Sequence, residues 1–141
     1  MNELVQLARP MGVTCHRAFD MTREPIEAME DLISIGIDRI LTSGQSDSAL
    51  DGAPLIRKLI SKSEGRIIIM PGHGIKEHNF EEIMNATGAN EFHLYLTRQV
   101  PTSMQFIRDN VKMGKPDQSE YEITLVDSEK FKIVKSIISS R

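Results

Sequence analysis

Three side chains with useful chemistry stand within five residues of one another near the start of the chain: His16, Arg17 and Asp20. An imidazole can transfer a proton or bind a metal ion, a guanidinium can hold an anion, and a carboxylate can accept a proton. They follow Val13-Thr14-Cys15, a short run that is typical of a strand. Because parallel α/β proteins place their sites where strands end, we predict that a functional site begins here.

A second pair of such residues, Glu91 and His93, occurs later in the chain. In a strand over 91–96, Glu91, His93 and Tyr95 would share one face because side chains alternate. We expect that face to look into the interior or the mouth of the fold. His93 can also be a buried structural histidine, so both interpretations stay open. The candidates for catalytic chemistry are His16, Arg17, Asp20, Glu91 and His93, and the sequence assigns no role to any of them.

Two polar turns follow further β-branched runs and could bind an anion. The turn after Met70 contains Gly72, His73 and Gly74, and a glycine turn between a strand and a helix can expose backbone N–H groups. A tight turn that merely requires glycine explains the same pattern. The polar turn after Leu41 could bind an anion in the same way, and the alternative interpretation is an ordinary solvated loop. The predicted anion-binding set is Arg17, Thr42, Ser43, Gly44, Gly72, His73 and Gly74.

Histidine supplies the candidate metal ligands, because His16, His73 and His93 could converge at the rim that the strand ends form. Cys15 is the sole cysteine, which excludes an internal disulfide and a cysteine cage. Strand alternation points Cys15 away from His16, and we interpret it as a small residue packed beneath a helix. The eight methionines form no close group, so their spacing predicts no thioether metal site.

Strand and helix patterns alternate along the chain in the order βαβαβαβ. The strands end near residues 16, 42, 71 and 95, and the helices between them are expected over about 24–35, 54–63 and 80–86, after a short helix that ends before Pro10. A long irregular loop over 101–119 then precedes a strand over 121–126 and a last helix over 128–139. That helix would bury Phe131, Val134, Ile137 and Ile138. The order predicts parallel strands joined by right-handed crossovers, in a single domain over residues 1–141.

Composition limits the classes of function. The 141 residues carry a formal net charge of −3 with no basic stripe, which argues against a nucleic-acid partner. No run is long and apolar enough for a membrane span, and the first nine residues lack the pattern of a signal peptide. We therefore expect a cytoplasmic protein with no membrane partner.

Four segments together resemble the copper homeostasis protein CutC family: His16-Arg17-Ala18-Phe19-Asp20-Met21, Arg39-Ile40-Leu41-Thr42-Ser43-Gly44, Met70-Pro71-Gly72 with Gly74-Ile75, and Glu91-Phe92-His93. They stand in the family's order and spacing, and the likeness covers nearly the whole chain. The resemblance implies a TIM (β/α)8 barrel, a cytoplasmic protein that self-associates, and a role in copper homeostasis.

The chain resembles only the C-terminal half of that family, from the end of its fourth helix onward. Since a closed barrel of this type needs about 250 residues, we predict a truncated form: a partial barrel with about four parallel βα units plus a C-terminal strand and helix. Two residues depart from the family pattern. His73 stands where the family usually has glycine, which would strain the turn if that position needs positive φ. Tyr95 stands where a small residue is common and could fill part of the pocket.

Three hypotheses for function follow. The leading one is a partial CutC-like protein of copper homeostasis that binds or handles copper, a ligand suspected from the resemblance alone. The second is an enzyme or binding protein for a small anionic or phosphorylated metabolite, in which Arg17 and the 72–74 turn hold the anion while Asp20, Glu91 or a histidine transfers a proton. The third is an inactive half-barrel that acts only by forming homo-oligomers through open sheet edges.

Overall fold

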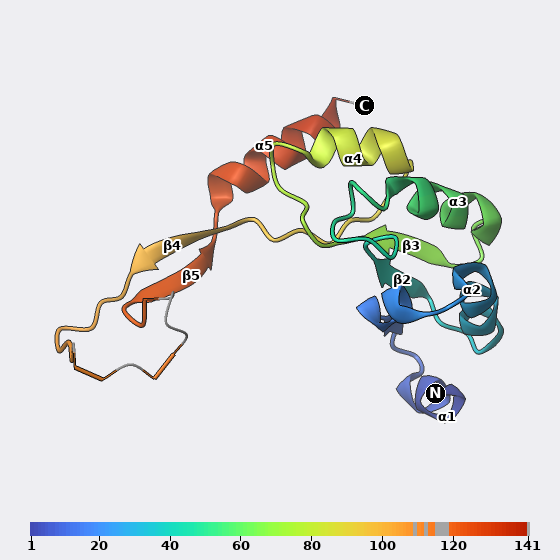
Figure 1. The fold of residues 1–141 in the computed structure, drawn as a ribbon, viewed down its shortest axis with the longest axis horizontal. Helices are drawn as coiled ribbons and strands as arrows, with labels where there is room; N and C mark the ends of the chain where they lie inside the picture. Colours follow the sequence, from blue (N-terminus) through green and yellow to red (C-terminus); the bar gives the residue numbers. More distant parts are fainter. Residues whose placement is uncertain (109, 112, 115–118, 141) are drawn as a thin grey trace. The chain divides into compact units, whose positions relative to one another are not determined.

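The computed structural model describes residues 1–108, 110–111, 113–114 and 119–140, and the chain divides into two compact units, 1–95 and 96–141 (Figure 1). The first unit contains the strands β1 (Thr14–Cys15), β2 (Arg39–Thr42) and β3 (Ile68–Pro71), with the helices α1 (Asn2–Ala8), α2 (Pro25–Ser34), α3 (Ala53–Ser63) and α4 (Phe80–Thr87). The second contains β4 (Thr97–Pro101), β5 (Glu122–Val126) and α5 (Ser128–Ser139).

The first unit is built on a parallel sheet in the order β1-β2-β3. Thr14 pairs with Arg39 and Arg39 with Ile68, so the three strands start level and end at a common edge. A helix follows each strand, α2 contacts α3, and α3 contacts both β3 and α4. Figure 1 shows these helices succeeding one another along one side of the sheet. The predicted parallel α/β arrangement of strand and helix units is therefore confirmed.

Burial alternates along the strands because only one face of the sheet is covered by helices. Ile40 and Ile69 are fully or almost fully buried, whereas their neighbours Leu41, Ile68 and Met70 are half-buried. The covered face packs against a core of helical side chains: Met29, Leu32, Ile56, Leu59, Phe80, Ile83 and Met84. The half-buried face is the one that would line the inside of a closed barrel.

The first strand is shorter than expected, which corrects the predicted alternation beyond Cys15. A 3-10 helix, η1 (Arg17–Met21), replaces the strand after His16. The reason is local: the imidazole Nδ1 of His16 accepts a hydrogen bond from the amide of Ala18 at 2.9 Å and caps η1. Arg17 and Ala18 consequently do not lie on opposite faces of a strand, and Phe19 is buried instead.

The expected fourth strand over 91–95 forms only in part, and this prediction was wrong in its extent. Residue 93 makes a single parallel bridge to Gly72 beside β3, with its amide donating to the carbonyl of Pro71 at 2.9 Å. Phe92 packs edge to face against Phe80, with 4.9 Å between ring centroids, and thereby anchors the segment to α4. The sheet therefore has three strands and one isolated bridge among the described residues.

The second unit differs from the sequence-based expectation in its pairing. The strand expected over 121–126 is present as β5, but it pairs antiparallel with β4, which was not foreseen. The irregular segment expected over 101–119 is present where it is described, while Lys115 and Pro116 within it lie outside the described residues. On α5, Val134 is buried as expected, whereas Phe131 and Ile138 are exposed, so the predicted stripe is wrong at those two residues. None of the helices, over the described residues, has the length and apolar character needed to cross a membrane.

Candidate functional site

Asp20 is the centre of a hydrogen-bonded cluster at the carboxyl ends of β1 and β2. Its side chain is only 7% exposed, although the residue is charged. Arg17 Nε donates to Asp20 Oδ2 at 2.8 Å, and Arg17 Nη2 donates to Ser43 Oγ at 2.8 Å. The carboxylate also accepts from the hydroxyl of Thr42 and from the amides of Ser43 and Gln45. Two of the candidate site residues, Arg17 and Asp20, are thus directly hydrogen-bonded to each other.

Burial acts to raise the pKa of Asp20, but the hydrogen bonds outweigh it. The hydroxyl of Thr42, the guanidinium of Arg17 and the amides of Ser43 and Gln45 all stabilise the charged form, so the pKa of Asp20 lies below its ordinary value. The carboxyl group of Asp20 is consequently deprotonated and negatively charged at neutral pH. A group of this kind holds and orients its neighbours better than it transfers protons.

The turn after β2 already holds an anion, and that anion is the carboxylate of Asp20. The amides of Ser43 and Gln45 point at Asp20, and the amide of Gly44 donates to Thr42 Oγ1 at 2.8 Å. Thr42, Ser43 and Gly44 are all buried. These three candidates for anion binding therefore support Asp20 and, through it, the guanidinium of Arg17.

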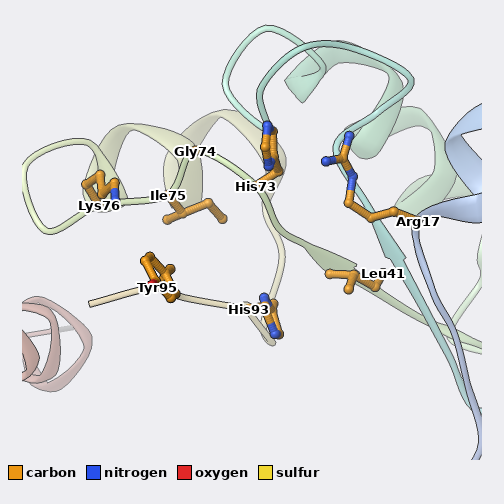
Figure 2. A pocket seen from close by; sticks show the side chains of 8 residues that line it. All are labelled: Arg17, Leu41, His73, Gly74, Ile75, Lys76, His93 and Tyr95. Atoms are coloured by element: carbon orange, nitrogen blue, oxygen red, sulfur yellow. The ribbon is translucent and has the colours of Figure 1, made fainter. Parts of the chain in front are cut away.

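An open pocket of about 470 Å³ lies beside this cluster at the carboxyl ends of β2 and β3. Figure 2 shows its side chains placed around an open space, with Arg17 and Leu41 on one side and Lys76 and Tyr95 on the other. Its lining residues are Arg17, Leu41, His73, Gly74, Ile75, Lys76, His93 and Tyr95. The pocket thus joins four predicted site residues, Arg17, His73, Gly74 and His93, and its lining contains no carboxylate.

The turn at residues 72–74 shapes this pocket. Gly72 is buried, and a Cβ at that position would lie 2.5 Å from Leu41 Cδ1 and 3.2 Å from His93 Cβ, so a larger residue would require these side chains to move. Its amide donates to the carbonyl of Thr42 at 2.9 Å and is already used within the fold. His73 follows with φ of 79°, in the left-handed region that favours glycine. The strain expected from a histidine at this position is therefore present, and its exposed imidazole borders the pocket.

The predicted histidine triad is not gathered at one point. His73 and His93 line the pocket, but His16 is not among its lining residues, and its Nδ1 is occupied by the amide of Ala18. Cys15 borders a different, apolar cavity of about 430 Å³ with Phe19 and Leu32. Burial raises the pKa of its thiol, which keeps it protonated and poorly suited to bind a metal. No group of three or more His, Cys, Asp or Glu side chains that could hold a metal ion occurs within the described part of the chain.

Glu91 lies away from the pocket lining and is paired with Arg39. Arg39 Nε donates to Glu91 Oε2 at 2.6 Å, a bond from β2 across to the segment beyond β3 on the half-buried face of the sheet. Glu91 therefore links β2 to the segment that follows β3 and α4. A role for Glu91 in proton transfer stays a prediction.

Sequence reasoning missed Lys76 and Gln45. Lys76 lies two residues beyond the 72–74 turn, and its Nζ stands 5.4 Å from the centre of the Tyr95 ring. Gln45 has φ of 55°, donates its amide to Asp20 and its side-chain nitrogen to the carbonyl of Thr22. A lone surface lysine after a turn gives no signal in the sequence, whereas the extension of the polar turn to Gln45 could have suggested a role for it.

These features define the class of the molecule: an α/β protein with a parallel sheet, helices over one face, and a pocket at the carboxyl ends of the strands, as in part of a barrel. The chain matches the CutC family over residues 1–98, and it belongs to that family. It is 48% identical over 133 residues to a CutC family protein of Parabacteroides distasonis, covering 94% of this chain and 55% of that protein.

Further relatives agree with this membership. The chain is 43% identical over 135 residues to the mouse protein named copper homeostasis protein cutC homolog, covering 95% of this chain and 50% of that protein. A crystal structure of a CutC protein from Streptococcus agalactiae matches with a TM-score of 0.58 and 26% identity, covering 65% of this chain and 48% of that one. The chain therefore spans about half the length of the curated relatives that it matches.

Proposed function

We propose that this chain takes part in copper homeostasis as a partial CutC barrel, with the pocket at the strand ends as its ligand site. Family membership and the names of the mouse and human relatives support the role. The observation on the structure that carries the site is that His73 and His93 border one pocket. A role as an enzyme, a cytoplasmic location and self-association through the open sheet stay predictions.

The pocket offers the type of side chain that binds copper, but it offers fewer ligands than a complete coordination sphere needs. Imidazole nitrogen is a good ligand for copper, and the pocket offers two imidazoles, from His73 and His93. The described residues hold no larger group of ligating side chains, so solvent, a bound small molecule or another chain would complete the coordination. We therefore expect copper to bind reversibly through two side chains. We do not expect an ion that is permanently bound and fully enclosed by protein ligands.

A copper titration tests this role directly. Cu²⁺ binding, measured by isothermal titration calorimetry, should weaken at least about tenfold in His73→Asn and in His93→Gln, since each removes one ligand. Asparagine is chosen at position 73 because it tolerates positive φ. The exposed His78 provides the control, and His78→Gln should bind copper as the natural chain does. Unchanged affinity in both pocket variants would exclude the two-imidazole site.

A further inference from the structure

The same pocket carries a concentration of positive charge that copper binding does not explain. Arg17, from η1, and Lys76, from the connection between β3 and α4, border it together with the imidazoles of His73 and His93, and its lining contains no carboxylate. Asp20 lies behind Arg17 and balances one of the two fixed charges. Figure 2 shows Arg17 and Lys76 well separated across the open space. The fixed charges of Arg17 and Lys76 would attract an anion into the pocket.

Arg17 is held ready for such an anion. Its Nε is bound to Asp20 and its Nη2 to Ser43, both at 2.8 Å, so the guanidinium is fixed before any ligand arrives. A fixed donor costs less conformational entropy on binding than a free one. The Nε side of the guanidinium is already used by these partners, which leaves Nη1 and the second hydrogen of Nη2 to donate to a ligand.

The remaining donors stand apart and suit a group with several acceptor oxygens. Arg17 comes from η1, His73 and Lys76 from the connection between β3 and α4, and His93 from the segment after α4, so these donors reach the pocket from three parts of the chain. A phosphate has three terminal oxygens that can accept from such dispersed donors, whereas a carboxylate has two in one plane. Leu41, Ile75 and the ring of Tyr95 add an apolar lining against which a carbon skeleton can lie.

We infer that this pocket binds a small organic phosphate, with its phosphoryl group beside Arg17 and the imidazole of His73 and with Lys76 facing the other end of the ligand. The strain at His73 supports the assignment: a non-glycine residue at φ of 79° between two glycines is unfavourable for folding, and strained residues concentrate at functional positions. The inference goes beyond the copper role and does not rest on it.

The test uses the full chain with EDTA present, so that copper plays no part and failure here leaves the copper titration untouched. Calorimetry should show glycerol 3-phosphate binding at least about tenfold more tightly than glycerate, and no binding of glycerol. Lys76→Gln should weaken glycerol 3-phosphate at least about tenfold, because one of the two fixed positive charges that line the pocket is lost. Lys62→Gln, an equal charge change on the exposed end of α3, should have little effect.

A second pair of variants separates the contact at His73 from its strain. His73→Gly and Glu64→Gly both relieve positive φ, and each should raise the melting temperature by about 2–4 °C. Only His73→Gly should also weaken glycerol 3-phosphate binding. The inference is overturned if the natural chain shows no heat with millimolar glycerol 3-phosphate, if glycerate binds as tightly, or if Lys76→Gln and Lys62→Gln behave alike.

Discussion

Replacing Asp20 with alanine is expected to lower the free energy of unfolding by about 2–4 kcal/mol. The substitution leaves the hydroxyl of Thr42 and the amides of Ser43 and Gln45 without an acceptor that is only 7% exposed, and it leaves the half-exposed guanidinium of Arg17 without its partner. Buried donors without an acceptor lower the free energy of unfolding more than the loss of an exposed ion pair does. Urea unfolding followed by circular dichroism measures the effect.

The loss should depend on pH in a definite direction. The pKa of Asp20 is lowered by folding, so its contribution to stability is complete above the ordinary aspartate pKa of about 3.9. The contribution is then lost as the pH falls through the lower folded pKa, because protonation removes the charge that the cluster holds. The difference between the natural chain and Asp20→Ala should therefore shrink in acid and stay constant around neutral pH.

An exposed ion pair provides the control for this prediction. Glu30 accepts two hydrogen bonds from Arg66, both at 2.7 Å, on the outside of the first unit. Glu30→Ala also removes one carboxylate from a bidentate pair, but water can solvate Arg66 afterwards, so the loss should be much smaller than for Asp20→Ala. Equal losses in the two variants would show that the Asp20 cluster does not contribute through its burial.

The order of strands and helices could be predicted from the sequence because each boundary has a local cause. Pro25 stands in the first turn of α2, Gly88 ends α4 in the left-handed conformation, and apolar residues recur at helical spacing between such signals. The association of Arg17 with Asp20 and Ser43 also follows from local rules, since the ends of parallel strands meet at one edge.

Other parts of the site depend on atoms that a pattern does not reveal. The strand after Cys15 stops because a side-chain nitrogen of His16 caps the backbone two residues on, and a strand pattern contains no sign of that competition. The 42–45 turn has the composition of an anion site, yet its donors face the carboxylate of Asp20 from 22 residues away in the chain. Composition predicts that donors are present, and only the fold determines which anion they meet.

Self-association is the second large effect that we expect, and it follows from the uncovered face of the parallel sheet. Parallel sheets are found with both faces covered, yet Leu41, Ile68 and Met70 are left half-buried on the face away from the helices. Among the described residues β1 pairs only with β2, so its other edge presents unpaired backbone groups. A two-fold axis parallel to the strands would place two such faces together and supply a neighbour for each open edge.

Light scattering on the purified chain should accordingly give a mass of about twice 15.9 kDa. Met70→Lys places a charge on the uncovered face and should reduce the mass to that of one chain, with the helical circular dichroism signal retained. Ser61→Lys makes the same charge change on an exposed residue of α3, outside that face, and should leave the dimer intact. If the natural chain is instead a folded monomer, or if both lysine variants dissociate equally, this face is not the interface, and the open sheet is tolerated by the single chain.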